Sequence, residues 1–532
     1  MPDSAASVLR WVAFGILAAV IGLAPAIFWP IGEGGSPSVS PPLQLAKSGL
    51  IRYGGAAILL VCAALLVGDP LRHWLRARLG VLLLAALLLW AGFSILLSPN
   101  SGLSLNQYLN QAMLIAVAAL TPLFLRTGRQ VWVLLACSLA GSVVVAAVVW
   151  LAVAGFTSIT QPIYGSDPLA MLEQGADLAG SLEGGRGRAA AISTLGNPEY
   201  TGSFLAAAFL LAGCLAMDGW GSRRAHRWGF WAGLLLMAFL GGAALLSESR
   251  TVAVIVAAGL LARWLLSTSF RGVTIVSVLS ILAVSGVLMG PAAVLVPGSL
   301  ILFAAVVIEY RRGHLNENWT RLDARIRKLF LFAPVVLLLG LLAVATVSPL
   351  RVRAVRYASR FAESDSSDRS VRMRLVLFML AGEMALQDPV FGAGPGFYGP
   401  RYFPALDDVV RSDASGTMAF ARLDARTWFG KQAHNDFLQM AAELGVPYLA
   451  LFLALLTWVF WRLSRIARAP SPDAFLAGLA RALAVTLVGY MAMMLSSFPL
   501  DEGARTATFW GLVAAAVGLI AIAAEQSEAP PA

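Results

Sequence analysis

A chain of 532 residues with 58% hydrophobic and only 13% charged residues cannot fold as a soluble domain, because charged residues normally make up about a quarter of a globular protein. Its mean hydropathy is +0.76. The net charge of +10 does not indicate nucleic acid, since the arginines fall in loops between apolar runs, where the positive-inside bias explains most of them. Each apolar run is long enough to cross a bilayer as a helix. We therefore predict an all-α, polytopic transmembrane helix bundle.

We expect about 12–14 membrane spans. We expect the first span to be retained and not cleaved off as a signal peptide, because no small-residue cleavage pattern follows it. The segment 54–68 is short, and the pair around Gly290-Pro291 could instead form one re-entrant unit, which leaves the count open. The fourteen candidate spans are 9–29, 54–68, 79–98, 109–125, 131–155, 200–217, 228–246, 251–268, 272–290, 292–309, 329–348, 446–463, 480–499 and 507–524.

Arginines gather in alternate short loops, and this pattern predicts the orientation. Cationic loops stay cytoplasmic, so both termini are expected inside the cell and the long loop 156–199 outside. The chain then divides into an N-terminal bundle (1–348), a large extracytoplasmic loop (349–445) and C-terminal transmembrane helices (446–532). The predicted outer short loops contain few cations, namely Lys47, Arg52, Arg250 and Arg505.

The large outer loop is predicted to contain an amphipathic helix. Ser370–Gln387 places Met373, Leu377, Leu380 and Met384 on one face, so the helix would lie on the membrane or dock on the bundle. A turn-rich stretch follows at 392–396, where glycine lets the backbone approach a ligand closely. Seven arginines lie between positions 351 and 374, and an anionic ligand at the outer face would explain them.

His434 closes this loop and is one of only four histidines. An imidazole, with an unperturbed pKa of about 6.5, can take a proton from an attacking hydroxyl near neutral pH. A guanidinium group suits a lipid pyrophosphate, because it donates two parallel hydrogen bonds to phosphate oxygens and stays charged. The candidate arginines in predicted outer segments are Arg186, Arg188, Arg250 and Arg374.

Each candidate also has a plainer interpretation. Arg250, at the end of a span, could extend to the lipid headgroups, and Arg374 could be a solvated residue of its helix. Asn435 could cap the following helix, with His434 as a structural hydrogen-bonding residue. Two further arginines could be ordinary loop charges, namely Arg186 and Arg188.

Taken together, the motifs resemble the O-antigen ligase and polymerase superfamily. The strings that carry the resemblance are Arg374–Phe378, Asp388–Phe397 and Ala433–Gly445, preceded by Thr194–Pro198 and Ser249–Thr251. They supply an arginine with an aromatic residue four positions later, a Pro-x-x-Gly-x-Gly loop and a His-Asn pair. The resemblance covers roughly residues 185–450 and leaves the first five and the last two spans unsupported.

The resemblance implies a glycosyltransferase that needs no metal or cofactor. Such enzymes take a glycan from an undecaprenyl-pyrophosphate carrier and transfer it, with inversion, to a hydroxyl of lipid A core or of another glycan. The expected setting is the periplasmic face of a bacterial inner membrane, where the chain would meet the lipid-linked donor and the glycan acceptor. Three arginines, Arg188, Arg250 and Arg374, would hold the pyrophosphate as leaving group, and His434 would orient or deprotonate the acceptor. The expected substrate-binding residues are Arg188, Arg186, Asn197, Asn435 and Gly394.

This sequence departs from the family pattern in three ways. It has two arginines, Arg186 and Arg188, where one is expected, and Arg188 is preferred because it lies nearer to Asn197. Phe378 stands where tryptophan is commoner, and the span count exceeds that of the family.

Two alternative functions remain at this stage. A polysaccharide or O-antigen polymerase would use the same donor, and the sequence does not separate it from a ligase. A transporter or flippase of lipid-linked sugars belongs to another class. It is disfavoured because the spans hold almost no ionisable residues at mid-membrane depth, where coupling residues usually lie.

Overall fold

The computed structural model of the protein describes residues 3–27, 41–68, 72–154, 193–195, 198–218, 223–247, 249–266, 369–412, 432–469, 473–501 and 503–528. Every element within these ranges is an α-helix or a short 3-10 turn, which confirms the all-α prediction. Eight of the described helices are long and apolar enough to cross a membrane, so the protein is a multi-pass membrane protein. The predicted spans at 272–290, 292–309 and 329–348 lie outside the described residues, and the total of fourteen stays a prediction.

The described elements, in chain order, are α1 (Asp3–Ala26), α2 (Pro41–Gly68), α3 (Arg72–Leu75), α4 (Arg78–Leu97), α5 (Ser101–Leu120), η2 (Thr121–Leu123), α6 (Gly128–Val153), η4 (Ser193–Leu195), α10 (Pro198–Asp218), α11 (Arg223–Leu246), α12 (Arg250–Leu265), α18 (Arg369–Gln387), α19 (Tyr398–Ser412), α21 (Asp436–Leu444), α22 (Val446–Arg468), α23 (Ala474–Met494) and α24 (Gly503–Glu528). Almost all of them lie in one compact unit, formed by residues 1–262 and 369–532.

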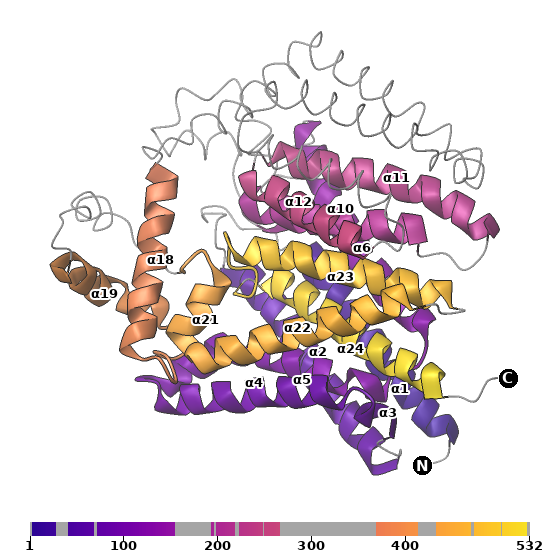
Figure 1. Ribbon diagram of the computed structural model, residues 1–532, viewed down its shortest axis with the longest axis horizontal. Coiled ribbons are helices and arrows are strands. Elements are labelled where there is room, and N and C mark those ends of the chain that lie inside the picture. The colour runs from indigo at the N-terminus through magenta and orange to yellow at the C-terminus, as the bar shows by residue number, and fades with distance from the viewer. Residues whose placement is uncertain are drawn as a thin grey trace, which may run out of the picture. The chain divides into compact units, whose positions relative to one another are not determined.

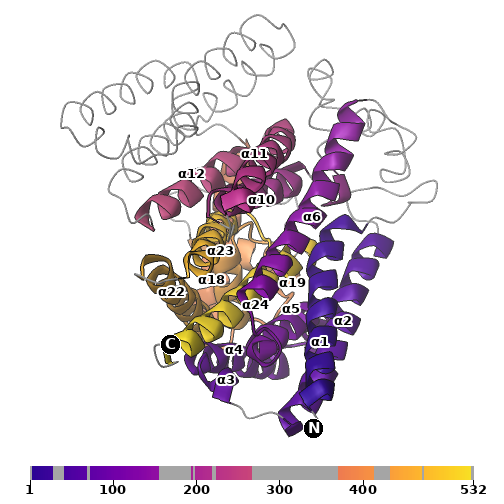
Figure 2. The same ribbon diagram turned by 90° about the vertical axis from the view of Figure 1, so that its right-hand side faces the viewer.

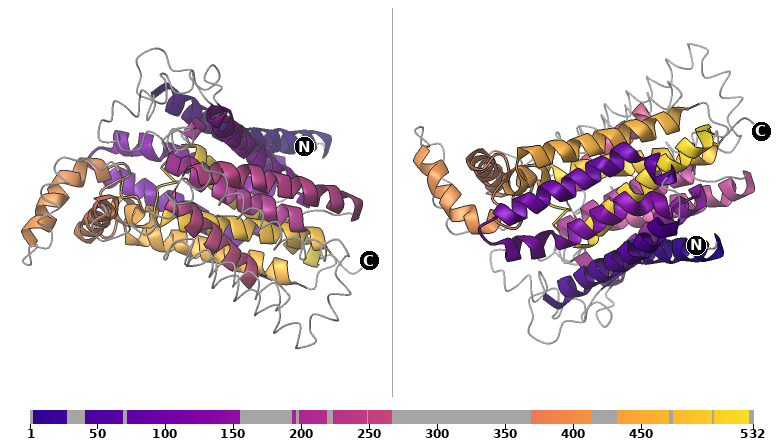
Figure 3. Two further views of the ribbon diagram at one scale, coloured as in Figure 1. Left: turned by 90° about the horizontal axis from the view of Figure 1, so that it is seen from above. Right: turned by 90° about the horizontal axis from the view of Figure 1, so that it is seen from below.

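Helix α24 forms the centre of this unit. It contacts α1, α5, α6, α22 and α23, and 89% of its most apolar stretch is buried, against 28% for α2. Figure 2 shows α1 and α2 side by side with α6 next to α1, and Figure 3 shows α4 beside α22. The outer helices expose large apolar side chains such as Leu60, Leu89 and Leu96, as expected for surfaces that face lipid.

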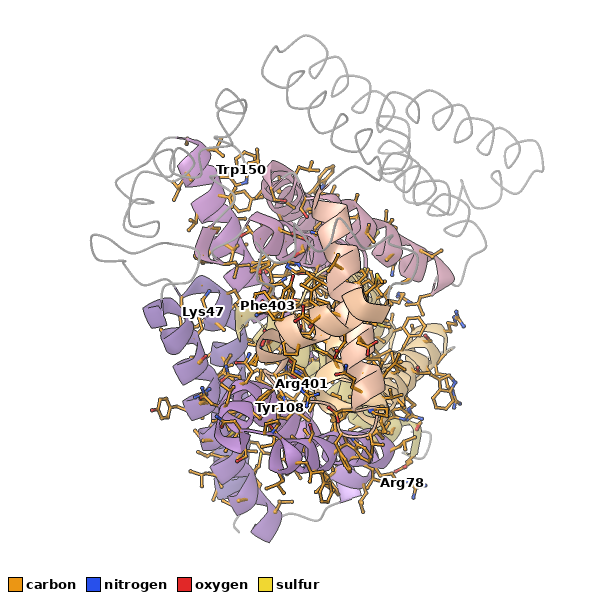
Figure 4. All side chains as sticks on the ribbon, turned by 90° about the vertical axis from the view of Figure 1, so that its left-hand side faces the viewer. Lys47, Arg78, Tyr108, Trp150, Arg401 and Phe403 are labelled. Atoms are coloured by element: carbon orange, nitrogen blue, oxygen red, sulfur yellow. The ribbon has the colours of Figure 1, made fainter. Side chains whose placement is uncertain are left out.

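Two of the expected outer loop cations lie inside α2, and the prediction of a loop there is wrong. Lys47, labelled in Figure 4, is buried and donates to the carbonyl of Thr194 at 2.7 Å. Arg52 donates to the Asn110 side chain at 2.9 Å and to the Asn106 carbonyl at 2.8 Å. These polar partners allow both cations to lie within α2, which begins at Pro41, well before the predicted start at residue 54.

The predicted amphipathic helix is confirmed as α18. Its face formed by Val376, Leu377, Leu380 and Met384 is fully buried. That face packs with buried residues of α19 and α21 into one hydrophobic cluster. These three helices lie together at one end of the described unit in Figure 1, so α18 docks on protein through this face.

The glycine-rich stretch that follows α18 is locked onto the end of α21. Ala393 N–H donates to the Ala442 carbonyl at 2.9 Å, and Gly394 N–H donates to the Glu443 carbonyl at 2.8 Å. Gly392, Gly394 and Gly396 all have positive φ, a region that other residues rarely adopt. The Pro-x-x-Gly-x-Gly motif, residues 389–394, and the segment Glu443–Gly445 therefore form one joint.

Helix α4 supports this joint from the other side. Trp90 donates to the Leu444 carbonyl at 3.1 Å and stacks on Phe391, and the Ser94 hydroxyl donates to the Phe391 carbonyl at 2.6 Å. A side chain at Gly394 would collide with Ser98, since its Cβ would lie 2.5 Å from that hydroxyl oxygen. Close packing against Ser98 therefore explains why a glycine stands at position 394. Its predicted role in substrate binding stays a prediction.

Gly445 is the last residue of the joint, and a substitution there tests how much the joint contributes to stability. Its φ is 86°, and an added Cβ would lie 2.0 Å from the carbonyl oxygen of Val390. We expect Gly445→Ala to lower the free energy of unfolding by at least about 3 kcal/mol, through strain and a backbone clash. The measurement is unfolding of purified protein in detergent. The matched control is Gly382→Ala in α18, where a Cβ meets nothing within 4 Å and alanine favours the helix. Equal unfolding curves for the two variants would contradict the role of the joint.

Candidate functional site

His434 lies immediately before α21 in a strained conformation that its neighbours impose. Its φ is 54°, one of two positive values among the described non-glycine residues. On one side, Ala433 N–H donates to the Gln439 side chain at 3.1 Å. On the other, Asn435 caps α21 by accepting from Leu438 N–H, and its amide donates to the Leu495 carbonyl at 3.1 Å. Strain held in place by several contacts is typical of functional sites.

The cap at Asn435 confirms half of the plainer interpretation of this motif. The other half, a structural hydrogen bond from His434, is not seen at Nδ1, which is buried and has no hydrogen-bond partner among the described residues. Instead, the imidazole stands edge-on to Phe498, with ring centroids 4.8 Å apart. The ring is thus held by an aromatic contact and leaves a polar atom for other chemistry.

Arg374 is paired across the molecule with Glu199, in the first turn of α10. Its Nη2 donates to both carboxylate oxygens, at 2.8 and 3.0 Å. The Thr251 hydroxyl lies 3.4 Å from the same carboxylate and 3.2 Å from the Ser496 hydroxyl. Arg374 is therefore not a simply solvated residue of its helix. It joins the large loop to the turns at one end of the transmembrane helices.

A second guanidinium group, that of Arg505, is fully buried in α24. It stacks over the Tyr200 ring at 4.1 Å and donates to the Ser497 hydroxyl at 3.1 Å. Phe498 lies 5.7 Å from the same guanidinium and also contacts His434. The expectation that Arg505 belongs to a loop is wrong, because its aromatic and hydroxyl partners allow it to lie within the helix.

These charges act together on His434. Burial lowers the pKa of the imidazole from 6.5 to about 4 and is the largest cause. The Glu199 carboxylate opposes this by raising the pKa, while the guanidinium groups of Arg374 and Arg505 lower it further. The imidazole is therefore neutral at pH 7, which leaves it able to accept a proton.

Three acidic side chains lie further along α21 and at the turn before α24. Asp436, Glu443 and Asp501 line a cavity of about 30 Å³, enough for a water molecule. Burial raises the pKa of Asp436 well above its usual value, and that of Glu443 to about 8. Asp436 accepts from Leu500 N–H at 3.2 Å, and Glu443 accepts from Tyr398 N–H at 3.0 Å. These contacts hold α21 between α19 and the α23–α24 turn.

The structure thus brings Arg374 and His434 together at one end of the helices. Arg250 begins α12, next to Thr251 and hence at the same end, although its side chain lies outside the described residues. The predicted Arg186, Arg188 and Asn197 are also outside the described residues. Gly394 lies in the joint behind α21.

Sequence reasoning missed Glu199 and Arg505. Arg505 left a usable signal, since an arginine at the edge of an apolar run is expensive unless it has partners. Glu199 left none, because an acidic residue in the first turn is ordinary for any helix. The adjacent 3-10 turn η4 fixes the start of α10, because Thr194 donates to the Pro25 carbonyl and Ser193 to the Val145 carbonyl, each at 2.7 Å.

Fold and site together define a polytopic, all-helical membrane protein with a charged site at one end of its helices. Residues 290–453, somewhat under a third of the chain, match the family model described as O-antigen ligase. This match confirms the resemblance carried by the motifs, and it supports a function of the O-antigen ligase or polymerase type. It includes Arg374 and His434 and ends before Arg505. No curated protein matches the chain.

The lowered pKa of His434 predicts a pH dependence of stability. The folded value of about 4 lies below the ordinary 6.5, so the unfolded chain alone takes up this proton as pH falls from 6.5 toward 4. The contribution of neutral His434 is complete above pH 6.5 and is lost below it. Between pH 7 and 5, we expect the unfolding free energy of His434→Gln to fall by on the order of 2 kcal/mol less than that of the wild type. Parallel pH curves for the two proteins would contradict a neutral buried imidazole.

Proposed function

We propose that the protein transfers a glycan from an undecaprenyl-pyrophosphate carrier to a hydroxyl acceptor, such as lipid A core oligosaccharide. The observation that carries the proposal is that a neutral imidazole, His434, and the partly exposed guanidinium of Arg374 lie at the same end of the helices, near enough for the guanidinium to lower the pKa of the imidazole. These residues come from the two most characteristic motifs of the chain. One group suits removal of a proton from a hydroxyl, and the other suits a phosphate leaving group.

The reaction we propose is a single displacement. The acceptor hydroxyl gives its proton to His434 while its oxygen attacks the anomeric carbon, and the bond from that carbon to the pyrophosphate breaks. The arginines stabilise the charge that develops on the departing pyrophosphate, an electrostatic role that needs no metal. Arg374 and Arg250 would share this task, since Arg250 begins the helix whose Thr251 approaches the partner of Arg374. Inversion at the anomeric carbon follows from a single attack.

The arrangement of charges supports a site at the periplasmic face of a bacterial inner membrane. Helices α10, α12 and α24 begin at the site, and α23 ends there. The basic stretches at Arg223 and at Arg465–Arg468 belong to the opposite ends of α11 and α22. At that opposite end Arg76 forms ion pairs with Glu525 and Glu528, close to the C-terminus. With cationic loops inside, both termini would be cytoplasmic and the site would face outward.

Removal of the imidazole is the most direct test. We expect His434→Ala to reduce glycan transfer by at least about 10³-fold, because the imidazole is the group that we propose takes the proton from the acceptor. The assay incubates purified protein with undecaprenyl-pyrophosphate glycan and a panel of acceptors, and measures free carrier and product. Unchanged yield and unfolding midpoint show that the variant is folded. Full transfer by this variant would refute the proposed base.

Removal of the guanidinium at Arg374 should act on the donor. We expect Arg374→Ala to raise KM for the donor and lower kcat/KM by about 10²-fold, since a bidentate contact to the leaving group is lost. The matched control is Arg481→Ala, because Arg481 bonds to the Ala467 carbonyl at the other end of α23. Added EDTA should leave all rates unchanged. A strict need for divalent metal, or equal effects of both substitutions, would contradict the arginine role.

A further inference from the structure

Glu199 takes the position on Arg374 that an anionic ligand would need. Both of its oxygens accept from the same guanidinium nitrogen, at 2.8 and 3.0 Å, with the Thr251 hydroxyl 3.4 Å away. A carboxylate and a phosphate offer a guanidinium the same kind of paired oxygen acceptors. An incoming phosphate must therefore compete with Glu199 for Arg374.

The exposure of this ion pair allows such an exchange. The side chains of Arg374 and Glu199 are 31% and 22% exposed, whereas Arg505 is fully buried. Partly exposed ion pairs are weak, because water and salt compete for both partners. A doubly charged pyrophosphate group has more charge and more acceptor oxygens than a carboxylate, so it is the stronger partner for the same guanidinium.

Glu199 also lies in the neighbourhood of His434, because Tyr200, the next residue in the chain, packs on Phe498, and Phe498 contacts the imidazole. Glu199 acts on the charge of His434 and raises the pKa of the imidazole, against the effects of burial and of two guanidinium groups. The imidazole Nδ1 is buried and without a partner among the described residues. A carboxylate that orients an imidazole and stabilises its protonated form is a recurrent arrangement in acyl-transfer enzymes.

We propose that Glu199 is an internal anion that pairs with Arg374 until the donor binds, is then exchanged for the donor's pyrophosphate, and afterwards stabilises protonated His434. This inference rests on the proposed function, and it couples the binding of the donor at Arg374 to the transfer of the proton at His434. Donor binding releases the carboxylate from Arg374. The hydroxyl proton moves to the imidazole, the new glycosidic bond forms as the bond to pyrophosphate breaks, and the imidazolium is paired with Glu199. Glu199 is thus a positioning residue that acts through His434. Until the donor binds, Glu199 is paired with Arg374 and the imidazole of His434 remains a weak base.

Binding of inorganic pyrophosphate tests the exchange without any transfer reaction. Glu199→Gln retains the shape of the side chain and removes its charge. We expect it to bind pyrophosphate about threefold more tightly than the wild type, measured by calorimetry on detergent-solubilised protein, because Arg374 no longer has an anionic competitor. Arg374→Ala should bind more weakly. The matched control is Glu383→Gln, since Glu383 lies on α18, the helix of Arg374, but accepts a hydrogen bond from the side chain of Gln387. Weaker binding by Glu199→Gln, or equal changes in both glutamine variants, would overturn the exchange.

Transfer kinetics test the second half of the inference. In Glu199→Gln, we expect kcat to fall by about tenfold with no rise in KM for the donor, and the acid limb of kcat to move to lower pH. The limb moves in this direction because the carboxylate raises the pKa of His434. A purely structural ion pair would change kcat and KM together and leave the limb in place, and that result would overturn the coupling. If the wild type transfers no glycan, the proposed function fails, whereas the pyrophosphate measurement still decides the exchange.

Discussion

The ion pair between Arg374 and Glu199 is the contact on which the organisation of the site depends. It joins α18, which belongs to the large loop, to the first turn of α10 in the transmembrane helices. The two residues are 175 positions apart in the chain. The same carboxylate contacts Thr251 and acts on the charge of His434. Without it, the guanidinium of Arg374 would lose the carboxylate that its Nη2 contacts through both oxygens.

Much of the fold could be predicted from the sequence because the membrane imposes simple rules. Apolar length located the eight described helices that could cross a membrane, the period of Leu377, Leu380 and Met384 located α18, and the Asn435 cap located the start of α21. The rules failed where a charge enters a helix. Lys47, Arg52 and Arg505 were expected in loops, yet each lies in a helix with carbonyl, amide or aromatic partners. Those partners come from distant segments and leave no local pattern.

The candidate site was predictable to a smaller extent. Arg374 and His434 are distinctive, because they belong to motifs with unusual composition. Glu199 became visible only as the partner of Arg374, since pairing depends on how α10 and α18 pack. The support that α4 gives to the glycine joint was equally hidden. Trp90 and Ser94 are unremarkable residues of an apolar helix, and only the structure shows them bonded to the carbonyls of Leu444 and Phe391.

The balance of charge around His434 explains why an anion site at a membrane surface would contain its own carboxylate. The guanidinium groups of Arg374 and Arg505 both lower the pKa of His434, because a positive charge disfavours the protonated imidazole. Arg505 is stabilised permanently by aromatic rings and a hydroxyl, so it needs no exchangeable anion. Arg374 has no such aromatic contact among the described residues, and it is the more exposed of the two. A carboxylate at Glu199 therefore balances the charge of the more exposed of these two guanidinium groups, and the same carboxylate raises the pKa of His434 and so favours its protonated form.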